Sequence, residues 1–101
     1  MIKPLDQMLE ADPRYQDLLI EEPAGEWRAL SLGDHHAIVA AIVIPASVPD
    51  EVATLFRRAQ HAFLYAWFDY ELAPLAEAQA FAALESALRL RLTMKGADAA
   101  L

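Results

Sequence analysis

The helical character of the chain is clearest in residues 49–92, which read PDEVATLFRRAQHAFLYAWFDYELAPLAEAQAFAALESALRLRL. Two helical patterns follow one another here, and Pro74 separates them. Residues 63–68 (FLYAWF) place large apolar side chains on every side of the first helix. A helix that is apolar all round must be covered all round, and a chain of 101 residues leaves little to cover it with. We therefore expect another chain, a second copy, or sequence beyond these residues to complete the surface.

The first of the two helices is expected to span about residues 49–71. Ser47 and Asp50 have the spacing of a capping box, with Pro49 in the first turn. At about 100° per residue, one face of this helix is mostly apolar. That face collects Val52, Leu55, Phe56, Ala59, Ala62, Phe63, Ala66, Trp67 and Tyr70. The opposite face begins basic and ends aromatic, so the two ends of the helix are expected to meet different surroundings.

The second helix is expected to span about residues 74–95, antiparallel to the first. Pro74 lacks the amide that a helix interior needs, so the first helix must end or kink before it. A ridge of large apolar side chains follows, formed by Phe81, Leu84, Leu88 and Leu92. Beside it runs a smooth ridge of Ala76, Ala80, Ala83 and Ala87, which would let another helix approach closely. Lys95 and then Gly96 suit the last turn and the residue after it, so the helix is expected to end there.

Shorter helices are expected in the N-terminal part of the chain. Residues 4–10 place Leu5, Met8 and Leu9 on one face. Asp12 followed by Pro13 predicts a second helix that stops before Pro23.

Residues 26–44 allow two interpretations. Alternation over residues 26–32 fits a short extended piece, and Ser31 with Asp34 forms a second capping box that would open a helix over residues 35–44. Alanines favour that helix, whereas the β-branched residues among 38–44 suit a strand. The predicted fold class is all-α, with a strand or hairpin within residues 26–44 as the alternative.

Composition limits the classes of function. The chain is 56% hydrophobic, contains no cysteine and carries a formal net charge of −7. The acidic balance argues against a general phosphate-binding surface, and the lack of cysteine removes thiolate chemistry and cysteine-based zinc sites. Neither a signal pattern nor an uninterrupted apolar span of about 18 residues is present. We expect a single cytoplasmic domain over residues 1–101, or the N-terminal part of a larger protein, outside the membrane.

Few side chains suggest chemistry. Arg57, Arg58 and His61 lie near aromatic residues and could bind nucleic acid. We favour the simpler interpretation that they form the solvent-exposed end of a helix whose other end is a protein interface. His35 and His36 are adjacent, so they point about 100° apart and cannot readily share one metal ion. No serine lies in a Gly-x-Ser-x-Gly context, and no Gly-rich phosphate loop is present. We predict no catalytic residue, no metal and no cofactor.

Residues 55–60 (LFRRAQ) and 82–89 (AALESALR) resemble the first helical hairpin of the HEPN-like family (higher eukaryote and prokaryote nucleotide-binding). The resemblance covers less than half of the chain. It implies a helical bundle, commonly dimeric, and many members of the family are RNases of toxin–antitoxin or defence systems. Their catalytic motif is Arg, four to six residues, then His, on a late helix. Here only three residues separate Arg57 from His61, both on the early helix, so no catalytic role carries over.

Protein–protein association is the function that the sequence predicts, with a homodimer first. A large apolar surface on a small domain marks an interaction site, and a symmetric dimer is the commonest way to bury one. Because buried aromatic residues dominate interface energetics, the expected anchors are Tyr65, Trp67, Phe68, Phe81 and Leu84. The alternative function is a nucleotide- or RNA-binding HEPN-like fragment.

Overall fold

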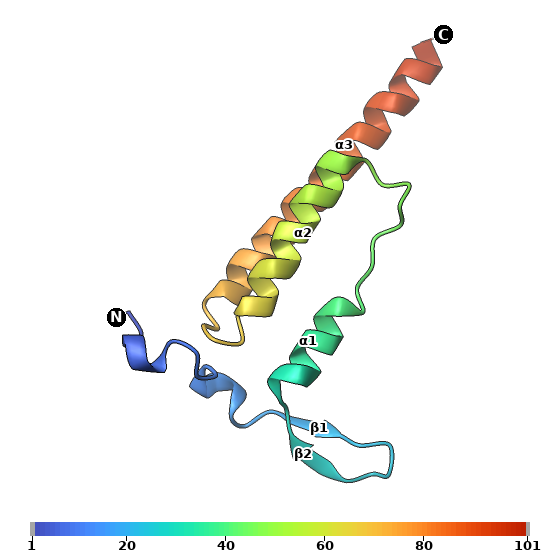
Figure 1. Ribbon diagram of the computed structural model, residues 1–101. Coiled ribbons are helices and arrows are strands. Elements are labelled where there is room, and N and C mark those ends of the chain that lie inside the picture. Colours follow the sequence, from blue (N-terminus) through green and yellow to red (C-terminus); the bar gives the residue numbers. More distant parts are fainter. Residues whose placement is uncertain (1, 101) are drawn as a thin grey trace.

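The computed structural model describes residues 2–100, and the side chains of residues 2–96. Most of the chain is helical (Figure 1). The elements are two 3-10 turns (Leu5–Gln7 and Pro13–Tyr15), strands β1 (Leu19–Glu21) and β2 (Trp27–Ala29), and helices α1 (Leu32–Ala40), α2 (Asp50–Tyr65) and α3 (Leu72–Ala100). The expectation of a purely all-α fold is therefore correct only in part, since a small antiparallel sheet accompanies the helices.

The centre of the fold is the antiparallel hairpin of α2 and α3. Small side chains form the seam between the two helices. Ala59 of α2, Ala66 directly after α2, and Ala76 and Ala83 of α3 are all buried. The Nε2 atom of Gln79 in α3 also donates a hydrogen bond across the seam, to the carbonyl oxygen of Leu55 in α2 at 3.3 Å. Two residues of the predicted alanine ridge, Ala76 and Ala83, are buried, and α2 is the helix that packs against α3.

The turn between α2 and α3 comes earlier than the sequence predicts. α2 ends at Tyr65, and Pro74 lies in the first turn of α3, where no helical amide is required of it. The N-terminal segment supplies hydrogen-bond donors to the carbonyl groups that follow α2. The backbone amide of Asp12 donates to the carbonyl oxygen of Trp67 at 2.8 Å. The Nζ atom of Lys3 donates to the carbonyl oxygen of Phe68 at 3.0 Å. These contacts satisfy carbonyl groups that a longer α2 would have bonded internally.

Of the two predicted capping boxes, the structure contains one. The Oγ atom of Ser31 accepts from the amide of Asp34 at 3.2 Å, and the Asp34 carboxylate accepts from the amide of Ser31 at 2.8 Å. This opens α1, which settles helix against strand for residues 35–40 and leaves the β-branched residues 42–44 in the connection to α2. The prediction of a capping box at Ser47 is wrong. α2 begins at Asp50 and Pro49 is its N-cap residue, so Ser47 lies too far from the helix to cap it.

A strand replaces part of the helix predicted after Asp12. The 3-10 turn ends at Tyr15, whose side chain is buried in the core, and the chain then pairs Ile20 with Arg28 in an antiparallel ladder. Gly25 makes the tight turn of this hairpin at a φ of 90°, a conformation that glycine adopts at no steric cost. The expected extended piece within residues 26–32 is confirmed as β2.

The molecule is flat and open. Its Cα atoms extend over 58 × 40 × 17 Å, and their radius of gyration is 18.1 Å, whereas a compact domain of this length has about 13 Å. α3 contributes to the elongation, because it continues through Gly96 to Ala100 rather than ending at Lys95. Figure 1 shows its C-terminal half projecting beyond the start of α2. Among the described residues no large side chain is fully buried.

Candidate interaction surface

A small aromatic cluster holds the N-terminal half against the helical hairpin. The ring of Tyr15 lies 4.9 Å from that of Trp67, and the ring of His35 lies 5.7 Å from both of them (centroid to centroid). The Nε2 atom of His35 donates to the carbonyl oxygen of Phe63 at 2.9 Å. His35 is thus a buried structural residue that joins α1 to α2.

Asp12 fixes the other contact between the two halves. Its carboxylate accepts from the backbone amides of Arg14 at 3.0 Å and Tyr70 at 2.8 Å. Burial alone would raise the pKa of Asp12, but these hydrogen bonds and the charges of Arg14 and Lys3 lower it on balance. The carboxylate is therefore held ionised at a place where it orders the α2–α3 turn.

Arg28 connects the strand hairpin to the start of α1. Its guanidinium donates to both carboxylate oxygens of Asp34, at 2.5 and 2.7 Å, and it also pairs with Glu22. The Arg28 guanidinium lowers the pKa of Asp34 well below its ordinary range, and the Ser31 amide and hydroxyl add to this effect. These ion pairs hold the start of α1 against the strand hairpin.

One face of α3 is apolar and uncovered. Large side chains along it remain exposed: Phe81 by 62%, Leu84 by 54%, Leu88 by 54% and Leu92 by 68%. At about 100° per residue they lie between about 100° and 180° around α3 from Ala83, which faces the seam. We call these four residues the outer stripe. It includes two of the predicted interface anchors, Phe81 and Leu84, in an orientation that no other element of the described chain covers.

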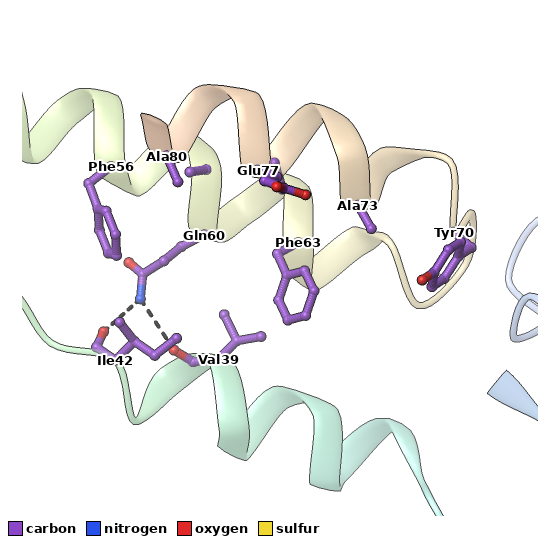
Figure 2. A pocket seen from close by; sticks show the side chains of 11 residues that line it. Val39, Ile42, Phe56, Gln60, Phe63, Tyr70, Ala73, Glu77 and Ala80 are labelled. Atoms are coloured by element: carbon purple, nitrogen blue, oxygen red, sulfur yellow. Dashed lines mark hydrogen bonds between the residues drawn. The ribbon is translucent and has the colours of Figure 1, made fainter. Parts of the chain in front are cut away.

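An apolar groove of about 400 Å³ lies next to the outer stripe. Its lining comes from all three helices: Val39 and Ile42 on the α1 side, Phe56, Ala59, Gln60 and Phe63 of α2, and Tyr70, Ala73, Ala76, Glu77 and Ala80 on the α3 side. Figure 2 shows Gln60 crossing the groove between the two phenylalanines, where its Nε2 atom donates to the carbonyl oxygens of Val39 and Ile42. Glu77 lies where this groove meets the outer stripe.

The remaining predicted anchors separate into two environments. Tyr65 and Phe68 line a second hollow, at the α2–α3 turn, together with Met8 and Leu9. Trp67 is only 7% exposed, because it packs on Tyr15 within the same chain. Sequence reasoning did not include Met8 and Leu9 in a site, although their shared apolar face was the available signal.

The candidate nucleic-acid residues lie on the exposed side of α2. Arg57, Arg58 and His61 are all exposed, and His61 lines a shallow pocket with His36 of α1. Within the described residues, no group of three or more His, Asp or Glu side chains is placed to hold a metal ion.

Comparisons with protein-family models, curated proteins and solved structures give no match. The resemblance to HEPN-like proteins therefore stays an expectation from the sequence. Over residues 2–100, none of the helices combines the length and the apolar character that crossing a bilayer requires.

Proposed function

We propose that this protein is a self-association module that works as a homodimer. The single observation that carries the proposal is its accessible surface of 7853 Å². A compact monomer of 11.2 kDa has about 5,700 Å² by the usual scaling with mass. The chain therefore exposes about 2,150 Å² more than its size requires.

The size of this excess fits a stable interface. Specific complexes bury about 800 Å² on each partner, and obligate dimers bury more. The outer stripe and the adjoining groove supply apolar surface of the kind that such interfaces bury at their centre. A second copy is the partner that every molecule in solution always has available, and a two-fold arrangement buries the same surface on both copies.

Light scattering coupled to size-exclusion chromatography over a concentration series tests this proposal. We expect twice the chain mass of 11.2 kDa across the series. Leu88→Glu, in the centre of the outer stripe, should weaken the dimer by about tenfold or more because it places a charge in an apolar contact. Val43→Glu is the matched control, since Val43 is also exposed but lies in the α1–α2 connection. A folded wild-type monomer at all concentrations contradicts the proposal.

Nucleic-acid binding by Arg57, Arg58 and His61 is the second candidate function. It is supported by the exposure of all three side chains and by the position of His36 in the same pocket as His61. If it is correct, Arg57→Ala weakens binding of single-stranded RNA and reduces its salt dependence, without changing the oligomeric state. Unchanged binding in that assay excludes this role for Arg57.

A further inference from the structure

We infer that the dimer forms by antiparallel pairing of α3 with the partner's α3 along the outer stripe, with the two-fold axis level with Ser86. This inference rests on the self-association proposed above and specifies its geometry. Three properties of α3 support it: the spacing of its apolar residues, the order of its charges and the length of its free end.

The apolar residues of the outer stripe are arranged symmetrically about Ser86. Leu84 and Leu88 lie two residues to either side of it, and Phe81 and Leu92 lie about equally far out. In an antiparallel pair centred there, Leu84 faces the partner's Leu88. Phe81 then faces the partner's Leu92. Each large side chain meets another large side chain, and none is left over at either end of the stripe.

Charges at the ends of the stripe have the same symmetry. Glu77 and Lys95 are about five helical turns apart on the same line along α3, one on each side of Ser86 at equal separation. The antiparallel arrangement places Glu77 against the partner's Lys95, twice per dimer. A parallel pair would instead place Glu77 against the partner's Glu77 and Lys95 against the partner's Lys95. Exposed ion pairs add little affinity but penalise wrong pairings, so these charges set direction and register while the apolar stripe supplies the association.

The free end of α3 fits the same arrangement. With 29 residues against 16, α3 is about 20 Å longer than α2 at 1.5 Å per residue. Its last part carries Leu92 and Met94 with 68% and 59% of their surface exposed. In the antiparallel pair this part lies along the first half of the partner's α3, beside the groove that Figure 2 shows. Each copy thus covers the surface that the other leaves open, and the two-fold symmetry closes the assembly at a dimer.

Charge reversal on the full chain tests the pairing. Glu77→Lys and Lys95→Glu each create two like-charge contacts in an antiparallel dimer, so each should raise the dimer Kd by about three- to tenfold at low salt. The double variant exchanges the two charges and should return the Kd close to the wild-type value. Glu26→Lys, in the β1–β2 hairpin, makes the same change of net charge as Glu77→Lys but lies outside the stripe, so it should leave the Kd unchanged. In a parallel dimer the single changes only replace one repulsive contact by another, so neither should weaken it.

Cross-linking gives a second measurement that does not depend on affinity. The chain has no cysteine, so single cysteines report only on the positions where they are introduced. A mixture of Glu77→Cys and Lys95→Cys chains should cross-link with a short bismaleimide, whereas either variant alone should not. A wild-type monomer in solution overturns the self-association itself. A dimer without charge rescue, or one in which Glu77→Cys cross-links to itself, overturns only the antiparallel register.

Discussion

The Nε2 atom of His35 donates a hydrogen bond to the carbonyl oxygen of Phe63 over 2.9 Å, and this bond joins α1 to α2. His35 is 3% exposed, and its imidazole lies edge-on to the ring of Tyr15. The adjacent histidine, His36, is exposed on the outside of the same helix. Two neighbouring residues of one type therefore have opposite roles, which makes them a matched pair for mutation.

His35→Ala should lower the free energy of unfolding by about 2–4 kcal/mol, because it leaves a cavity among aromatic rings and removes the donor for the Phe63 carbonyl group. His36→Ala should change it by less than about 0.5 kcal/mol. Urea unfolding followed by tryptophan fluorescence measures both, since Trp67 packs on His35. Equal effects of the two substitutions would contradict the structural role of His35.

Asp12 should make stability depend on pH in the acidic range. Its pKa is lower in the folded protein than its ordinary value of 3.8, so its contribution is complete above about pH 4 and is lost as the pH falls through the folded pKa. Asp12→Asn should therefore be less stable than wild type at neutral pH, and the difference should shrink below pH 4. Thermal unfolding of both proteins at a series of pH values measures the difference, which isolates Asp12 from the other carboxylates. A difference that stays constant with pH would contradict the lowered pKa.

Ser31→Ala should lower the free energy of unfolding by about 1 kcal/mol, because it removes the cap of α1. Ser47→Ala should have almost no effect, since Ser47 makes no capping contact with α2. Chemical denaturation measures both variants under the same conditions. A larger loss for Ser47→Ala would place the N-cap of α2 at Ser47 instead of Pro49.

These two serines show how far local sequence patterns reach. Ser31 and Asp34 are close in sequence and form the predicted box, as the alanine ridge of α3 forms the predicted seam. At Ser47 the pattern is the same, but the position where α2 begins decides whether it is used. The helical hairpin could thus be predicted from the sequence, whereas its ends could not.

Long-range contacts account for the remaining differences. As a large aromatic residue, Trp67 is of the type expected to anchor an interface. Tyr15 and His35, which are distant in sequence, cover it within the same chain. Residues 19–21 form a strand because residues 27–29 pair with them, which a helical pattern after Asp12 does not reveal. The apolar ridge of Phe81, Leu84, Leu88 and Leu92 could be predicted from the sequence, whereas the groove could not be placed because three helices contribute to it.

Ala83→Leu should destabilise the hairpin by about 1–3 kcal/mol, because Ala83 is buried in the seam and a larger side chain must push α2 and α3 apart. Ala82→Leu, at the neighbouring exposed position of the same helix, should be nearly neutral because leucine is also a good helix former. Differential scanning calorimetry compares their Tm values. A stable Ala83→Leu variant would mean that α2 does not occupy the alanine ridge.

Gly96→Ala should stabilise the protein, and it distinguishes the observed α3 from a helix that ends at Lys95. In the structure Gly96 lies inside the helix with ordinary backbone angles, and a Cβ atom added there would meet open space. Alanine at such a position is favoured by about 0.5–1 kcal/mol. At a helix end, the left-handed conformation would reverse the sign, as it should for Gly25→Ala, where φ is +90°. Circular dichroism and thermal unfolding measure the two variants, and a loss of helicity in Gly96→Ala would mean that α3 ends before Gly96.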